Sequence, residues 1–228
     1  MLNFANYLNK ILLLHNVINN WRNLALFCPN NKKGHYTTIL KKFHTWTKAG
    51  IFKNVHANLL NKNVLSKYTT NTTLNCYIDA THINNVSGVD GINFSDNKKK
   101  KTTKLTAICN DNKKILDFII AHRHDSKMVE PIVDAIKTKV KIRKINMVGD
   151  KGYKLNKDTL ARLENKNIKM HVPQRKNQKI KTSIVTKTHL KQRYKIENVF
   201  QQLKTFSRIR TRYDKKSKNF KHFYISRS

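Results

Sequence analysis

Acidic side chains are scarce in this 228-residue chain, which has 13 Asp and Glu against 47 Lys and Arg and a formal net charge of +34. An excess of this size favours a polyanionic partner, either nucleic acid or an anionic membrane, over an acidic protein or a small-molecule substrate. Lysine outnumbers arginine 37 to 10. Because lysine codons are A/T-rich, we attribute part of the charge to the base composition of the genome.

Cysteine and long apolar runs are also scarce. The three cysteines (Cys28, Cys76 and Cys109) are odd in number and widely spaced, which argues against a disulfide framework or a Cys-rich zinc site and favours a reducing compartment. No apolar run approaches the roughly 20 residues of a membrane span. The run ILLLH from Ile11 is short and lacks a cleavage pattern. We therefore expect no membrane partner, no secretion and, in a bacterium, a cytoplasmic or nucleoid-associated protein.

The six glycines and three prolines leave no linker and no internal repeat to mark a boundary. Apolar residues at helical spacing over 1–65 predict a small helical N-terminal region, truncated or complete, that contacts DNA or caps the rest and breaks at Gly50. From about residue 72, apolar and polar residues alternate instead, which indicates strands. We therefore expect two domains, over 1–65 and 70–228.

The second domain is expected to be α/β, a central sheet with helices outside it, because strand and helix patterns follow in the order β–β–β–α–β–α–β–α. The expected elements are a strand over 74–79, two strands around a turn at 110–112, a helix opened by Asp125 or Ser126, a strand ending at Asp150, a short helix capped by Asn156, a strand over 168–173, a lysine-rich loop, a helix over 188–206 and a basic tail.

Three carboxylates stand out among the few in the chain. Asp79 and Asp150 each end a predicted apolar strand, and carboxylates at the ends of adjacent strands can converge on a hard cation such as Mg²⁺. At about 100° per residue, Arg193, Glu197 and Lys204 share one stripe of the last predicted helix. That helix would turn Glu197 toward the two aspartates, and Arg193 and Lys204 would hold phosphates. Two Mg²⁺ or Mn²⁺ ions about 3.5–4 Å apart could then promote phosphoryl transfer.

Each residue also has a plain structural interpretation. A strand-end aspartate is often a turn residue or a helix cap, and a glutamate between cations is often a surface ion pair. Their occurrence together, in this order, favours a site.

These blocks resemble those of the DDE transposases of bacterial insertion sequences, in the group called insertion-sequence four and five. YIDATHI, VGDKGY and RYKIENVFQQLK resemble the two aspartate blocks and the glutamate block, and KKTTKLTAICND, HRHDSKMVEPIVDAI and MHVPQRKN resemble the segments between them. The family signature Y-x2-R-x3-E-x6-K is met by Arg193, Glu197 and Lys204, with Leu190 at the tyrosine position.

The resemblance implies an RNase H-like mixed sheet flanked by helices, with Asp79, Asp150 and Glu197 as a catalytic, metal-binding triad. It implies hydrolysis of a phosphodiester at the ends of a mobile element, then attack of the freed 3′-hydroxyl on target DNA. The partners would be double-stranded DNA, as terminal repeats and as target, and further copies of the chain in a homo-oligomer. The expected DNA-binding residues are Arg193, Lys204, Lys151, Lys104, Arg175 and Lys176.

Two other hypotheses remain open at this point. A truncated or repurposed copy would bind DNA without recombining it, which Leu190 and ends shorter than those of relatives suggest. A basic nucleic-acid-binding protein without catalysis would keep its three acidic residues far apart. The run Lys98–Lys101 is either a solvated charge run or a nonspecific phosphate contact.

Overall fold

The computed structural model describes residues 21–27, 35–63, 72–96, 98–137, 144–174 and 183–225. The chain divides into two compact units. Unit 1 comprises Met1–Asn58, His82–Thr103 and Gln202–Ser228, and unit 2 comprises Leu59–Thr81 and Lys104–Gln201. The division into domains over 1–65 and 70–228 stays a prediction.

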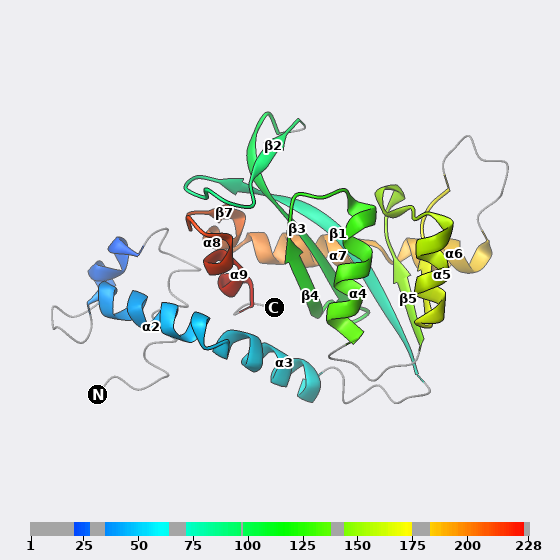
Figure 1. The fold of residues 1–228 in the computed structure, drawn as a ribbon, viewed down its shortest axis with the longest axis horizontal. Helices are drawn as coiled ribbons and strands as arrows, with labels where there is room; N and C mark the ends of the chain where they lie inside the picture. The colour runs from blue at the N-terminus through cyan, green and yellow to red at the C-terminus, as the bar shows by residue number, and fades with distance from the viewer. Residues whose placement is uncertain are drawn as a thin grey trace. The chain divides into compact units, whose positions relative to one another are not determined.

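The sheet of unit 2 has the strand order β4-β3-β1-β5-β6 (Figure 1). It is mixed, because β3 (Lys100–Asn110) and β4 (Ile115–Ile120) are antiparallel, whereas β1 (Thr73–Asn85), β5 (Lys144–Val148) and β6 (Ile168–His171) are parallel. This confirms the expected α/β class and the expected sequence of strands.

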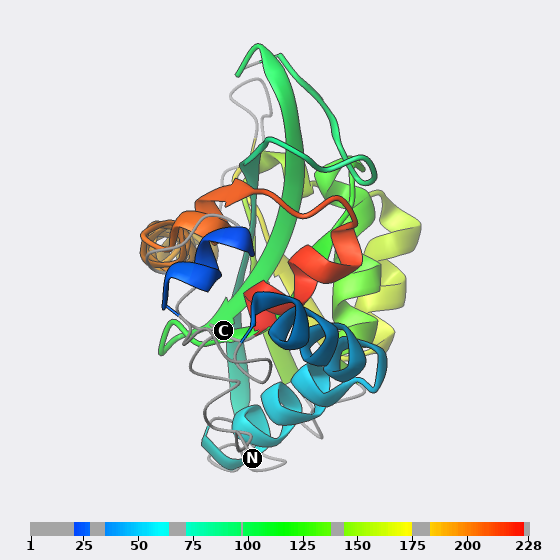
Figure 2. The same ribbon diagram turned by 90° about the vertical axis from the view of Figure 1, so that its left-hand side faces the viewer.

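Helices cover both faces of this sheet, as the edge-on view in Figure 2 shows. α4 (Val129–Lys137), which follows the 3₁₀ turn η3 (Asp125–Met128), and α5 (Lys157–Asn165) lie on one face. α7 (Tyr194–Lys204), preceded by α6 (Ile184–Lys191), lies on the other. The cap of α5 is the predicted one, since Asn156 accepts a hydrogen bond from the backbone of Thr159, whereas η3 is capped by His124.

The two-residue period of β1 assigns its side chains to these faces. Leu74, Cys76 and Ile78 are fully buried in the core that β1 shares with α4 and α5. The alternate residues Tyr77 and Asp79 therefore point to the face that carries α7. Helix α7 buries its own apolar stripe on that side through Ile196, Val199 and Phe200. The same alternation that builds the core thus delivers a carboxylate to the opposite face.

Several sequence-based boundaries are wrong. Strand β5 ends at Val148 rather than at Asp150, and β6 ends at His171 rather than at residue 173. The first strand does not end at Asp79 but continues to Asn85, because the apolar–polar alternation persists through buried Ile83. The predicted helix over 188–206 is two helices, separated at Gln192 and Arg193. The N–H of Gln192 bonds to His189 and Leu190, which closes α6 before α7 begins.

Unit 1 contains the N-terminal helices and the C-terminal segment. η1 (Arg22–Phe27) precedes α2 (Tyr36–Lys48) and α3 (Ile51–Asn63), whose last residues belong to unit 2. The predicted break is confirmed at Gly50, where φ is +70°, a region that favours glycine. Residues 1–20, also predicted helical, lie outside the described residues.

The expected basic tail is folded. It contains the short elements α8 (Ser207–Arg210), β7 (Thr211–Arg212) and α9 (Ser217–Ile225), with Phe220 fully buried. One unpredicted strand, β2 (Asn93–Ser95), pairs with the first residues of β3. Throughout the described residues, every helix is too short or too polar to cross a lipid bilayer.

Candidate active site

Adjacent parallel strands place the two predicted aspartates at the same level of the sheet. The last register pair between β1 and β5 is Tyr77 with Val148. Asp79 and Asp150 each lie two residues beyond that pair. Because neighbouring strands are about 4.8 Å apart, this register brings the two carboxylates to one edge of the strand pair. The expected adjacency of these strands is confirmed.

Asp79 lies in a poorly solvated position, with 19% of its side chain exposed. Burial is the largest influence on its pKa, which rises from 3.8 to about 6. A hydrogen bond of 2.8 Å from the Ala80 N–H and the charge of Arg193 act against this rise, and the charges of Asp150 and Glu197 add to it. The carboxylates of all three predicted residues therefore interact electrostatically.

Arg193 links two of the three carboxylates. Its Nη2 lies 2.7 Å from Glu197 Oε1, and its Nη1 lies 3.5 Å from Asp79 Oδ2. The contact with Glu197 spans four residues, as the predicted stripe required. Glu197 also lies in the first turn of α7, where the helix dipole favours a negative charge. The break between α6 and α7 thus positions a cation between carboxylates of β1 and α7.

In the loop after Asp150, two carboxylates lie close to Gly152. The Gly152 N–H donates to Asp150 Oδ1 at 2.8 Å, so Asp150 caps the 3₁₀ turn η4 (Lys151–Tyr153). A Cβ atom on Gly152 would lie 3.0 Å from Asp125 Oδ2 and 3.1 Å from Asp150 Oδ1. A fourth carboxylate, Asp125, therefore borders the loop of the second aspartate.

Lys104 neutralises that fourth carboxylate. Its Nζ lies 2.8 Å from Asp125 Oδ1 and donates to the carbonyl of Arg123 at 3.1 Å. Close to this pair, the side chain of Tyr153 is fully buried, and burial, followed by the charges of Asp125, Asp79 and Asp150, raises its pKa far above the usual range. The site is thus an acidic region with two cationic side chains, Arg193 and Lys104, at its margins.

A second contact seats α7 on the sheet. Lys195 Nζ lies 2.7 Å from Asp111 Oδ1 and 5.2 Å from the centre of the Tyr77 ring. Asp111 also accepts hydrogen bonds from Tyr77 at 2.6 Å and from Asn75 at 2.9 Å. Burial acts to raise the pKa of Asp111, but the bonds from Lys195, Tyr77 and Asn75 outweigh it and lower the pKa. This network fixes α7 to the sheet at Lys195, two residues before Glu197.

The donor chemistry of the three carboxylates fits a hard divalent cation, because Asp79, Asp150 and Glu197 offer only oxygen. Burial of Asp79, and to a lesser extent repulsion from Asp150 and Glu197, raises its pKa, and a bound cation would offset both effects. Their arrangement is less complete, since no group of three or more His, Cys, Asp or Glu side chains among the described residues is placed to hold a metal ion. Arg193 lies between two of them instead.

The remaining predicted residues fall in different surroundings. Lys151 is exposed at the start of η4. Lys204 ends α7, and burial, then the charge of Lys98, lowers its pKa. Leu190, at the signature's tyrosine position, is half-buried near the end of α6. Arg175 and Lys176 lie outside the described residues.

Sequence reasoning did not identify Asp111, Asp125, Tyr153 or Lys195 as parts of this site. The scarcity of acidic residues was the usable signal, because it makes Asp111 and Asp125 as noteworthy as Asp79. The partners of Lys195 and Tyr153, by contrast, become apparent only once the strands are paired.

The sheet order, with antiparallel strands on one side of β1 and parallel strands on the other, makes this a mixed α/β protein and fits the RNase H-like sheet that the sequence led us to expect. The model of the family described as transposase DDE domain matches residues 75–226, more than half of the chain. The chain therefore belongs to the transposase DDE domain family. Membership of the insertion-sequence four and five group stays a prediction.

Several solved structures share weaker similarity. The Mos1 strand transfer complex is 8% identical with a TM-score of 0.31, covering 90% of this chain and 76% of that one. A pre-cleavage Mos1 transpososome is 7% identical with the same TM-score, covering 91% and 78%. The Mos1 transposase paired-end complex with left transposon end is 7% identical at 0.31, covering 70% and 60%. Scores this low carry no weight for function. No curated protein sequence matches the chain.

Proposed function

We propose that this protein is a metal-dependent DNA transposase in which Asp79, Asp150 and Glu197 are the catalytic carboxylates. The main support is geometric: the register of β1 with β5 brings Asp79 and Asp150 to one edge of the strand pair, and Arg193 contacts both Asp79 and Glu197. The family match supports the transposase class. A basic protein without catalysis, which predicted distant carboxylates, explains this grouping poorly.

The reaction would proceed in two balanced steps. Water attacks a phosphodiester at the element's end, and the 3′-oxygen leaves as a 3′-hydroxyl. That hydroxyl then attacks a target phosphodiester and displaces a 3′-oxygen of the target, so no nucleotide cofactor is consumed. Bound Mg²⁺ or Mn²⁺ would supply activation of the attacking oxygen and stabilisation of the leaving one.

The protein's own residues would bind and orient these reactants. Asp79, Asp150 and Glu197 would hold the metal ions, and Arg193 would exchange its weaker contact with Asp79 for a DNA phosphate. Arg193 suits this role because its guanidinium is partly exposed and can bind a phosphate in two-pronged geometry. Lys204, Lys151, Lys104, Arg175 and Lys176 are proposed further DNA contacts. We also propose that two or more protomers hold two DNA ends, in the cytoplasm or on the nucleoid of a bacterial cell.

The alternative is a copy that binds DNA without recombining it. The position of Arg193 between Asp79 and Glu197, together with Leu190 in place of tyrosine, favours this second function. It predicts DNA binding without metal binding at the carboxylates.

The test compares the wild-type chain with Glu197→Gln on DNA carrying the element's own ends, with Mg²⁺ or Mn²⁺. Cleavage and strand transfer that vanish in the variant, while DNA binding persists, would support the proposal. Binding without cleavage in both proteins would favour the alternative, and cleavage unaffected by the substitution would exclude Glu197. Mn²⁺ binding followed by electron paramagnetic resonance gives a readout independent of activity, with Glu164→Gln, at an exposed position on α5, as matched control.

A further inference from the structure

Unit 1 contains a segment whose charged and apolar side chains lie outside the site described above. We define residues 86–101 as the arm. The arm follows β1, includes β2 and ends in the first two residues of β3, and residue 97 lies outside its described part. All of it belongs to unit 1.

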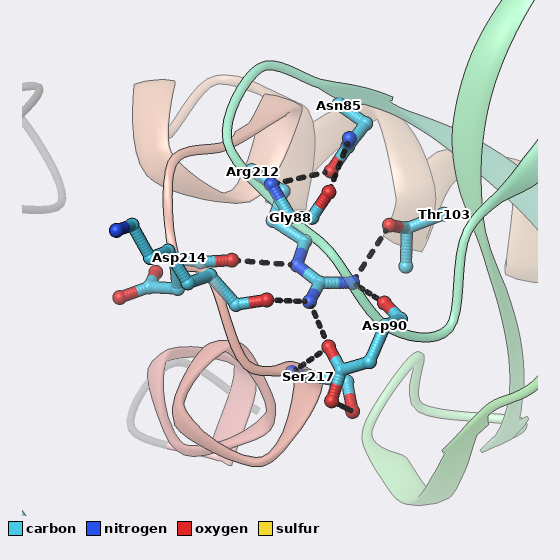
Figure 3. Close-up of polar contacts among 8 residues, drawn as sticks. Asn85, Gly88, Asp90, Thr103, Arg212, Asp214 and Ser217 are labelled. Carbon is cyan, nitrogen blue, oxygen red and sulfur yellow. Dashed lines mark hydrogen bonds and ion pairs between the residues drawn. The ribbon is translucent and has the colours of Figure 1, made fainter.

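The backbone of the arm is anchored to the C-terminal segment. The N–H of Val86 donates to the carbonyl of Arg212 at 3.0 Å, and the N–H of Val89 donates to the carbonyl of Lys215 at 3.0 Å. The guanidinium of Arg212 bonds to both the carboxylate and the carbonyl of Asp90, as Figure 3 shows. These contacts fix the first half of the arm.

The anchor is deeply buried and closely packed. Arg212 is 0% exposed and also donates to Thr103 Oγ1 at 3.1 Å and to the carbonyl of Asp214 at 2.9 Å (Figure 3). Gly88 approaches so closely that a Cβ atom there would lie 2.3 Å from Asn85 Oδ1 and 2.7 Å from the guanidinium of Arg212. The arm therefore presents its side chains from a rigid base.

Those side chains include three large apolar residues that unit 1 does not bury. Val86 is 62% exposed, Val89 is 70% exposed and Phe94 is 52% exposed. A single exposed apolar residue is ordinary, but three within nine residues of one anchored segment are available to contact a partner.

The same segment is strongly cationic. Its four consecutive lysines, Lys98–Lys101, are all exposed, two in the turn before β3 and two at the start of β3. Phe94 pairs in register with Lys101 across the hairpin, and directly opposite residues in an antiparallel pair project to the same face. Phe94 thus lies beside a lysine. Further along the chain, burial lowers the pKa of Lys204, and the nearby positive charge of Lys98 lowers it further. An anionic partner would relieve this crowding of positive charge.

We propose that the arm is a DNA-contacting wedge. Lys98–Lys101 contact phosphates of a duplex, and Val86, Val89 and Phe94 press between or against base steps, as apolar side chains flanked by cations do in proteins that bend DNA. Charge selects this occupant over the arm of a second copy, because the four consecutive lysines of one arm would face the four of the other. The choice of duplex DNA rests on the proposed function.

The apolar half of the wedge is tested with the double variant Val89→Ser, Phe94→Ser. The full chain is titrated onto a short duplex labelled with a donor and an acceptor dye at its ends, in EDTA so that no cleavage occurs. We expect the affinity of the double variant to fall roughly tenfold, the scale expected when one or two apolar side chains no longer pack on bases. The end-to-end energy transfer that reports bending should fall with it, while the salt dependence of binding stays unchanged.

The cationic half is tested with Lys98, Lys99, Lys100 and Lys101 all changed to Gln. Here the slope of log affinity against log salt should decrease by about 0.9 for each phosphate that a lysine no longer neutralises. The matched control for the double variant Val89→Ser, Phe94→Ser is Ile184→Ser. It removes an apolar side chain that is 82% exposed on α6, and it should change neither DNA affinity nor bending. Thermal unfolding at the wild-type midpoint verifies that the variants fold, as expected for exposed positions.

Three outcomes would overturn the inference. Wild-type affinity and bending in the Val89→Ser, Phe94→Ser variant would show that the arm does not wedge. A wild-type dimer that this variant converts to monomer, with DNA binding unchanged, would assign the surface to a second copy. Binding to anionic vesicles that depends on the same residues, without an effect on DNA, would assign it to a membrane. Metal-dependent cleavage that depends on Glu197 would survive each outcome, so failure here is distinct from failure of the proposed function.

Discussion

Arg193 and Arg212 differ in how completely the protein satisfies them. Arg212 is 0% exposed and makes hydrogen bonds along its whole guanidinium, to side chains and carbonyls of its own unit. Arg193 is 32% exposed, with one close contact to Glu197 and one longer contact to Asp79. A fully paired buried arginine holds structure, because any exchange of partners leaves buried groups unpaired. A partly paired, partly exposed arginine can exchange a carboxylate for a phosphate at little cost.

The largest expected effect is that of removing the Arg212 anchor. Arg212→Met leaves Thr103 and several carbonyls without their donor, and we expect it to destabilise the protein by about 3 kcal/mol or more. Urea-induced unfolding measures the change. Arg210→Gln, at an exposed position in the same segment, is the control and should unfold like wild type. Equal destabilisation by both variants would contradict a special role for Arg212.

The next largest effect is a gain in stability, expected when Asp79 is replaced. Its folded pKa of about 6 exceeds the ordinary value of 3.8, so between these values the folded state binds more protons than the unfolded state. Stability is therefore lost as pH rises through that window, at a cost on the order of 1–3 kcal/mol above it. Asp79→Asn should be more stable than wild type near neutral pH in EDTA, and inactive in cleavage.

Unfolding midpoints across pH provide the measurement for Asp79. The wild-type and Asp79→Asn profiles should converge below pH 3.8, diverge between 3.8 and about 6, and stay a constant distance apart above about 6. Asp96→Asn, at an exposed position in the turn after β2, should follow the wild-type profile. Parallel profiles for wild type and Asp79→Asn would contradict the burial-driven rise of this pKa.

A smaller effect is expected at the anchor of α7. Lys195 and Asp111 are 15% and 35% exposed, so solvent screens part of their 2.7 Å contact. A double-mutant cycle of Lys195→Met and Asp111→Asn should give a coupling free energy of about 1 kcal/mol. If the network positions Glu197, each single variant should also lower the cleavage rate more than it weakens DNA binding. Additive stability changes would show that the contact does not seat α7.

The smallest effect is expected at the pair Arg162 and Glu130, whose nitrogen and oxygen lie 2.7 Å apart on the surface. Solvent surrounds both side chains, and exposed ion pairs rarely contribute measurable stability. A cycle of Arg162→Gln and Glu130→Gln should therefore show no coupling, at low salt or high. A coupling free energy as large as that of Lys195 with Asp111 would show that burial does not explain the difference between the two ion pairs.

Local sequence patterns are enough to establish the order of the main elements, because alternating apolar residues define strands. That Asp79 and Asp150 each follow an apolar strand is also local, whereas the pairing of β1 with β5 is not, since β2, β3 and β4 lie between them in the chain. The four-residue spacing of Arg193 and Glu197 likewise predicts their contact, since helical geometry is local. Local rules are less reliable at boundaries, where β1 continues past Asp79 and the last predicted helix divides at Gln192.

The long-range partners of each charge, by contrast, depend on the three-dimensional fold. Asp111 and Lys195 are 84 residues apart in the chain and Arg212 and Asp90 are 122 apart, and no periodicity relates residues at such distances. The sequence pattern around Asp125 predicts a helix cap, whereas the approach of Gly152 places this carboxylate beside Asp150. Whether a charge is paired or buried depends on the surfaces that folding brings together. That is why Asp79, Asp150 and Glu197 can be proposed from the sequence, whereas the partners of Asp111 and Asp125 are seen only in the fold.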